Sequence, residues 1–90
     1  MNLSIIVPLY NESESILHFI DELSALYNNS SDTEVIFVND GSTDNTLSIL
    51  KSNMNSLPNS RIINLYRNYG KSIALQAGFD VAHGSIISMI

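Results

Sequence analysis

Three short polar segments, each following an apolar run, carry most of the chemistry of this 90-residue chain: Tyr10–Glu12, Asn39–Ser42 and Arg67–Lys71. The carboxylates Asp40 and Glu12 are hydrogen-bond acceptors for a base N–H or a ribose hydroxyl. The third segment holds two of the four Lys and Arg residues of the chain, which attract phosphate. A nucleoside diphosphate requires hydrogen-bond acceptors beside its base and ribose and cations beside its phosphates, and these three segments offer both.

Asp40 is expected at the carboxyl end of a buried strand. Val35–Val38 is a continuous, mostly β-branched run, typical of a strand covered on both faces of a parallel sheet. Gly41 allows a tight turn, Ser42 is the expected N-cap of a helix, and Asp44 is expected in its first turn. The same residue types also serve ordinary turns and caps, so solvated loop residues without a ligand are the alternative interpretation.

The rest of the chain alternates between strand and helix patterns. Three right-handed crossovers therefore connect a mostly parallel sheet of about four strands, which is an α/β fold. Because the carboxyl ends of parallel strands meet at one sheet edge, the three polar segments are expected side by side. The predicted strands are Leu3–Leu9, Val35–Val38, Arg61–Leu65 and Ser85–Ile90; the predicted helices are Glu14–Tyr27, a segment from Ser42 to before Pro58, and Ser72–Ala82, closed by Gly84.

Composition excludes several classes of function. Nine Asp and Glu residues outnumber four Lys and Arg residues, which disfavours a nucleic-acid partner. The chain has no cysteine, and His18 and His83 are too few for a zinc site. Without an export signal or a membrane-length apolar run, we expect a cytoplasmic chain. Because its last residues lie within a predicted strand, we expect part of a larger domain, with a sheet edge through which copies associate.

Other nucleotide-binding and signalling classes fit the spacing less well. No Gly-x-Gly-x-x-Gly follows the first predicted strand, and Gly70-Lys71-Ser72 lacks the earlier glycine of a P-loop. A signalling receiver domain needs an acidic pair after the first strand and an Asp after the third, where this chain has Asn11-Glu12 and Arg67-Asn68. A nucleotide-binding or interaction module without catalysis remains an open alternative.

The motifs together resemble those of a known family. Ile6–Glu12, Val38–Asp44, and Arg67–Lys71 with Ala74–Gly78 look like the successive N-terminal motifs of family 2 glycosyltransferases. The Arg-Asn-aromatic-Gly-Lys form is similar to the branch that makes polyprenol-phosphate sugars, including enzymes like dolichyl-phosphate mannose synthase. Asn39 departs from the pattern, since many members have a second Asp there.

The resemblance implies a GT-A fold and the transfer of a sugar from a UDP- or GDP-sugar to an acceptor. The candidate acceptor is a membrane polyprenyl phosphate, so the reaction would take place at the cytoplasmic face of the membrane. It also implies a divalent cation, Mg²⁺ or Mn²⁺, whose Asp-x-Asp ligands follow the fourth strand, beyond Ile90. Residues 1–90 are then the nucleotide-sugar-binding part, with no catalytic residue and no transferase activity alone. The implied nucleotide-binding positions are Pro8, Tyr10, Glu12, Val38, Asp40, Gly41, Arg67 and Lys71.

Overall fold

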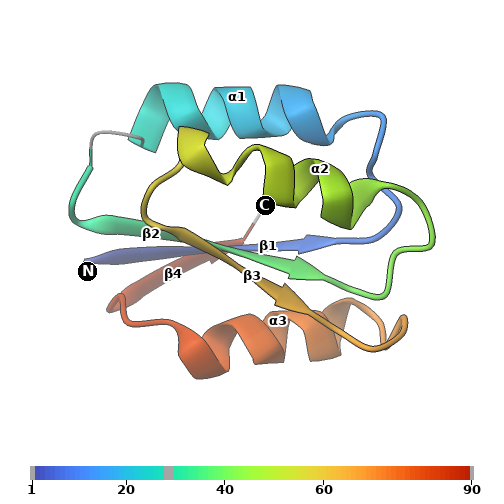
Figure 1. The fold of residues 1–90 in the computed structure, drawn as a ribbon. Helices are drawn as coiled ribbons and strands as arrows, with labels where there is room; N and C mark the ends of the chain where they lie inside the picture. Colours follow the sequence, from blue (N-terminus) through green and yellow to red (C-terminus); the bar gives the residue numbers. More distant parts are fainter. Residues whose placement is uncertain (1, 28–29, 90) are drawn as a thin grey trace.

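A computed structural model of the chain describes residues 2–27 and 30–89, in which strands and helices alternate as predicted (Figure 1). Ile90, the last residue of the fourth predicted strand, lies outside the described residues, as do residues 1 and 28–29. The elements are β1 (Leu3–Leu9), α1 (Ile16–Tyr27), β2 (Thr33–Asn39), α2 (Thr46–Ser52), the 3₁₀ helix η1 (Met54–Ser56), β3 (Ser60–Asn64), α3 (Lys71–Val81) and β4 (Ile86–Met89).

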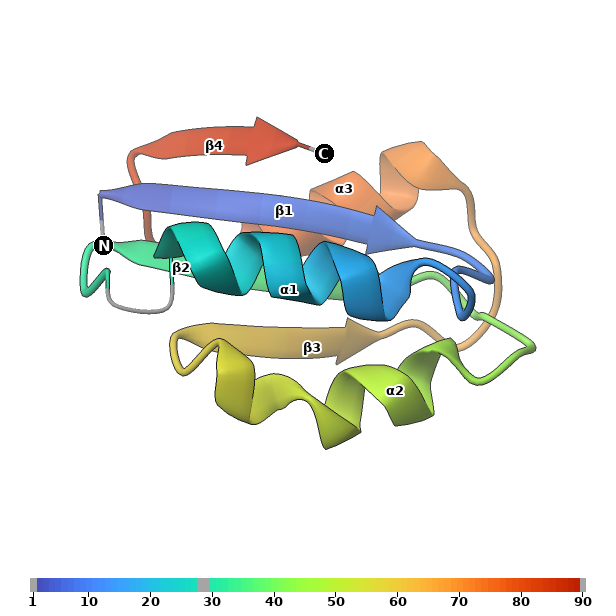
Figure 2. The same cartoon turned by 90° about the horizontal axis from the view of Figure 1, so that it is seen from above.

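The four strands form one parallel sheet in the order β3-β2-β1-β4, which confirms the predicted α/β class (Figure 2). The last residues of β1, β2 and β3 lie level, because Leu9 pairs with Asn39 and Asn39 pairs with Asn64. The chain adds β2 and β3 on one side of β1 and then returns to place β4 on the other. The carboxyl end of β1 is therefore the point where the strand order reverses, and ligands of open α/β sheets bind at such points.

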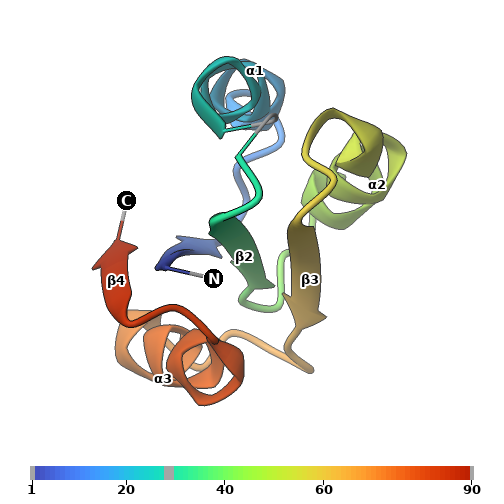
Figure 3. The same ribbon diagram turned by 90° about the vertical axis from the view of Figure 1, so that its left-hand side faces the viewer.

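Helices cover both faces of the sheet: α1 and α2 lie on one face and α3 on the other (Figures 1 and 3). Each face has its own apolar core, so β1 and β2 are buried on both sides. On the α3 face, the small residues Ala74 and Gly78 are buried. A Cβ atom on Gly78 would lie 2.5 Å from Ile6 Cγ2, so α3 reaches the sheet only because this side chain is absent.

Two helices begin later than predicted. α1 begins at Ile16 instead of Glu14, because a turn precedes it in which the carbonyl of Glu12 accepts from the N–H of Ile16 at 2.9 Å. α2 begins at Thr46, and Ser42 is not its N-cap, because the Ser42 hydroxyl accepts from the backbone N–H of Asn11 at 2.9 Å. The end of the predicted second helix is the separate 3₁₀ turn η1.

Gly84 does not close α3 as predicted. The helix ends at Val81 with Ala82 as its C-cap, and Gly84 lies on the sheet instead. Its N–H donates to the hydroxyl of Ser4 at 2.6 Å, and a Cβ atom there would lie 2.7 Å from the carbonyl carbon of Leu3. The glycine therefore permits the α3–β4 connection to touch the start of β1.

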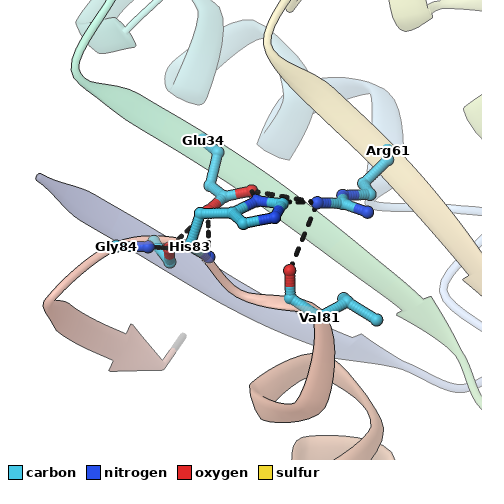
Figure 4. Close-up of polar contacts among 6 residues, drawn as sticks. Glu34, Arg61, Val81, His83 and Gly84 are labelled. Atoms are coloured by element: carbon cyan, nitrogen blue, oxygen red, sulfur yellow. Dashed lines mark hydrogen bonds and ion pairs between the residues drawn. The ribbon is translucent and has the colours of Figure 1, made fainter. Parts of the chain in front are cut away.

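A buried carboxylate, Glu34, fastens the same connection to the amino ends of the strands (Figure 4). Its Oε2 accepts from the Ser4 hydroxyl at 2.7 Å and from the His83 N–H at 2.6 Å, while Arg61 Nη2 lies 3.6 Å from Oε1. Burial alone would raise the pKa of Glu34. The hydrogen bonds from Ser4 and His83 and the positive charges of His83 and Arg61 outweigh it and hold the pKa below its usual value.

Candidate functional site

A pocket of about 280 Å³ lies at the carboxyl ends of β1 and β2, and we call it the strand-end pocket. It forms where the β1–α1 loop, the residue after β2 and the β3–α3 connection meet. Five of the eight nucleotide-binding positions implied by the sequence line it, namely Pro8, Tyr10, Glu12, Asp40 and Lys71, together with Leu9, Asn68 and Gly70.

Asp40 holds the β3–α3 connection in place. It is only 4% exposed, and its carboxylate accepts from the N–H of Tyr69 at 2.8 Å, from the N–H of Gly70 at 3.1 Å and from the Asn68 amide at 3.3 Å. A carboxylate offers about four acceptor positions. The connection therefore uses three of them and leaves about one for a ligand.

Gly41 brings the β2–α2 loop against the same connection. Its φ is +69°, and a Cβ atom would lie 2.1 Å from the carbonyl carbon of Arg67 and 2.3 Å from the backbone nitrogen of Asn68. The two backbones therefore touch at a distance that no side chain permits. Gly41 contributes to the site by this contact and not by a functional group.

Arg67 lies outside the strand-end pocket, in a wider groove of about 600 Å³ that we call the outer groove. Tyr10 lines both hollows, so they adjoin. The Arg67 guanidinium carbon lies 5.5 Å from the centre of the Tyr69 ring, a cation–π distance that restrains the long side chain. The outer groove is lined by Tyr10, Asn39, Gly41, Ser42, Thr43, Asp44, Leu47, Ser48, Asn64, Leu65, Tyr66, Arg67 and Asn68.

Val38 is the one implied site residue that lies in neither hollow. It is 0% exposed and belongs to the core cluster on the α3 face, with Ile6, Ile36 and Ala74. The structure therefore places its side chain under the site, as packing.

The amino end of α3 brings a cation and a helix terminus to the strand-end pocket. Lys71 is the first residue of α3, which spans 11 residues and has no side-chain cap at Gly70. The first N–H groups of such a helix and its dipole favour an anion. Glu12, which is exposed, also lines the strand-end pocket. The strand-end pocket thus combines the carboxylates of Asp40 and Glu12 with the positive charge of Lys71.

Sequence reasoning missed the polar residues that connect the loops. Asn68 donates to both the backbone carbonyl and the carboxylate of Asp40, each at 3.3 Å. Thr46, fully buried, accepts from the N–H of Glu12 at 2.9 Å. Both contacts join segments far apart in the sequence, and their only local signal is an Asp-x-Thr pattern at Asp44 and Thr46 that is typical of a helix start.

The described residues form neither a metal-binding cluster nor a membrane-spanning helix. No group of three His, Asp or Glu side chains within 2–27 and 30–89 is arranged to hold a metal ion. The described helices include none with both the length and the apolar character needed to cross a bilayer.

Comparison with known proteins identifies the family: residues 4–90 match the family described as glycosyl transferase family 2, and the chain belongs to it. Over 97% of its length, the chain is 42% identical to an uncharacterized glycosyltransferase of Synechocystis, of which it covers 28%. Over 93% of its length, it is 41% identical to the undecaprenyl-phosphate 4-deoxy-4-formamido-L-arabinose transferase of Yersinia pestis, of which it covers 26%.

Solved structures give the fold family. The chain superposes over its whole length on TarS of S. aureus in complex with UDP-GlcNAc, with a TM-score of 0.91 and 30% identity, and covers 26% of that chain. It also superposes, over 96% of its length, on a mannosyltransferase of Pyrobaculum calidifontis in complex with GDP-Man and Mn²⁺, with a TM-score of 0.82 and 27% identity, and covers 26% of that chain. The fold matches the N-terminal half of GT-A glycosyltransferases, as the resemblance implied, and the receiver-domain alternative is set aside. The chain spans about a quarter of the length of these relatives.

Proposed function

We propose that residues 1–90 are the nucleotide-sugar-binding part of a glycosyltransferase that uses a UDP- or GDP-sugar. The observation that carries this proposal is the strand-end pocket of about 280 Å³, which brings Asp40, Glu12 and Lys71 together. The pocket lies where the strand order reverses, the usual ligand position in open α/β sheets. The relatives crystallised with UDP-GlcNAc and with GDP-Man support the same donor class.

Asp40 is the residue we propose for the base. Three of its acceptor positions bind the β3–α3 connection, and the remaining one suits a single ring N–H. Uracil and guanine carry such an N–H on the ring, whereas adenine does not. Tyr10, 44% exposed, offers a ring face for stacking. Arg67 and Lys71 then lie on the diphosphate side.

The transfer itself breaks the bond between the sugar's anomeric carbon and the diphosphate and forms a bond to an acceptor oxygen. We propose a polyprenyl phosphate acceptor at the cytoplasmic face of the membrane, by analogy with the Yersinia relative. A bound Mg²⁺ or Mn²⁺ would neutralise the leaving diphosphate, and we propose that its ligands lie outside residues 1–90. The 90 residues alone are then expected to bind nucleotide without transferring sugar; labelled sugar transferred from UDP-GlcNAc or GDP-Man to undecaprenyl phosphate would overturn this expectation.

Calorimetric titration with UDP, GDP and ADP tests the proposed donor site. We expect UDP or GDP to bind more tightly than ADP. Lys71→Gln should weaken the tighter ligand by about tenfold, because a charge-assisted hydrogen bond to phosphate is lost. Lys51→Gln is the matched control, since Lys51 is an exposed residue in the last turn of α2, away from both hollows. An equal loss of affinity in both variants would mean that only the net charge of the chain matters, which would contradict a phosphate contact of Lys71. Equal affinity for all three nucleotides would contradict base recognition.

Self-association is a separate proposal that rests on the sheet edges. Among the strands of the described residues, β3 and β4 each pair with a single neighbour, and an unpaired strand edge can pair with another copy. Light scattering over a range of concentrations tests this proposal. A mass that stays at 9.9 kDa would contradict it.

A further inference from the structure

Asn11 has an unusual backbone conformation at the wall of the site. Its φ is +53°, and it is the only non-glycine with positive φ in the described part of the chain. Asn tolerates this left-handed region better than most residues, but the region still costs about 1 kcal/mol. Its neighbours Tyr10 and Glu12 both line the strand-end pocket, whereas Asn11 itself does not.

The side chain of Asn11 explains why this conformation persists. Its amide oxygen accepts from the N–H of Thr43 at 2.8 Å and from the N–H of Asp44 at 3.3 Å. Its own N–H donates to the hydroxyl of Ser42 at 2.9 Å. Since the backbone N–H groups of Thr43 and Asp44 can only donate, the amide oxygen of Asn11 must face them. Asn11 therefore binds three consecutive residues of the β2–α2 loop.

The residues after Asn11 continue the same connection. The N–H of Glu12 donates to Thr46 Oγ1 at 2.9 Å, and the N–H of Ser13 donates to Asp44 Oδ2 at 3.2 Å. Thr46 Oγ1 in turn donates to Asp44 Oδ1 at 2.5 Å. The backbone of the β1–α1 loop is thus fixed to the β2–α2 loop at successive residues. The side chains of Tyr10 and Glu12 remain available to the pocket.

We propose that Asn11 is a positioning residue for the nucleotide site: by joining the two loops, it holds Tyr10 and Glu12 at the wall of the strand-end pocket. This inference rests on the proposed nucleotide-binding function. The proposal gives Asn11 no contact with the ligand, and Asn11 acts only through Tyr10 and Glu12. Without its amide oxygen, the N–H groups of Thr43 and Asp44 lose their partner, and Tyr10 and Glu12 are placed less firmly.

Asn11→Gly tests the role of the amide oxygen, because glycine keeps the positive φ and removes only the side chain. The control is Asn45→Gly, the same substitution at an exposed residue of the same loop whose side chain makes no capping hydrogen bond. Urea unfolding first establishes that both variants are folded under the assay conditions. Each variant is then measured by NMR without ligand and by titration with UDP.

Without ligand, we expect Asn11→Gly to speed hydrogen exchange at the Thr43 and Asp44 amides and to lower the order parameters of Tyr10 and Glu12. With UDP, we expect its affinity to fall by about five- to tenfold, the effect of one or two lost hydrogen bonds, while Asn45→Gly binds like the unmodified chain. Unchanged order at Tyr10 and Glu12, or unchanged UDP affinity in a folded Asn11→Gly protein, would overturn the proposal. If the unmodified chain binds neither UDP nor GDP, the proposed function fails, while the ligand-free measurement still decides whether Asn11 positions the loop.

Discussion

Replacing Glu34 by Gln should destabilise the fold by about 2 kcal/mol at neutral pH. The carboxylate accepts two hydrogen bonds, from Ser4 and from the His83 backbone, at 2.7 and 2.6 Å. Making each a neutral hydrogen bond costs about 1 kcal/mol, the difference between charge-assisted and ordinary bonds. The Arg61 guanidinium is 44% exposed and 3.6 Å away, so solvent screening limits that ion pair to at most about 0.5 kcal/mol. Gln fits the same space, so no cavity contributes.

The difference between the two proteins should depend on pH. The pKa of Glu34 in the folded chain lies below its usual value of 4.5, because its hydrogen bonds and the nearby charges outweigh burial. Its stabilisation is therefore fully present above about pH 4.5 and is lost as the pH falls through the folded-state pKa. Below that pH, Glu34 is neutral, as Gln is at every pH. The stability difference should shrink from about 2 kcal/mol at pH 7 toward zero as the pH falls below the folded-state pKa of Glu34.

Urea unfolding followed by circular dichroism measures this difference, since the chain contains no tryptophan. Every other carboxylate is present in both proteins, so the difference isolates Glu34. Glu22→Gln is the control: Glu22 pairs with His18 on the surface, where its side chain is 60% exposed, and its loss should change stability by less than about 0.5 kcal/mol. A Glu34→Gln protein as stable as the unmodified chain at pH 7, or a difference that does not change with pH, would refute the reasoning.

Three further changes test the loops around the site. Gly41→Ala should lower the free energy of unfolding in urea by about 2–4 kcal/mol, because its Cβ meets backbone atoms. At Gly70 an added Cβ has nothing within 4 Å, so Gly70→Ala should cost only the strain of its positive φ, about 1–2 kcal/mol. Equal costs for the two substitutions would contradict the contact at Gly41. The hydrogen bond from the Thr46 hydroxyl lowers the pKa of Asp44 to about 2 from its usual 3.8, so its bonds should persist above about pH 4 and be lost as the pH falls toward 2. An NMR titration of the Ser13 amide with a midpoint near 3.8 would contradict this. Thr46→Val should cost about 1–3 kcal/mol in urea unfolding, because it removes two hydrogen bonds of a buried hydroxyl, and no loss would contradict their role.

The strands and their meeting edge could be predicted because their signal is local. Val35–Val38 is apolar at every position, and the structure buries it on both faces within the longer β2. The helix starts were less predictable. Ser13 and Ser42 have the residue type of an N-cap, but one donates its N–H to Asp44 and the other accepts from Asn11. These partners lie about thirty residues away, so no local pattern reveals them.

The features of the site likewise fall into those that the sequence predicts and those that depend on how the loops fold together. Residue type and strand ends were sufficient to bring Tyr10, Glu12, Asp40 and Lys71 to one pocket. The motif resemblance placed Val38 among the binding positions, yet its side chain lies in the core, because alternate residues of β2 face α3. Most acceptor positions of Asp40 already bind the β3–α3 connection. This contact depends on how closely two loops approach, and the spacing along the sequence does not encode that distance.

The most direct test of the central claim is a residue-resolved NMR titration of this chain with UDP, GDP and ADP, with and without Mn²⁺. We expect shifts centred on 10–12, 38–41 and 67–71, larger for UDP or GDP than for ADP. The amino-end cluster around Glu34 should not respond. Shifts centred on that cluster, or equal shifts with all three nucleotides, would contradict a base-selective nucleotide site at the carboxyl edge of the sheet.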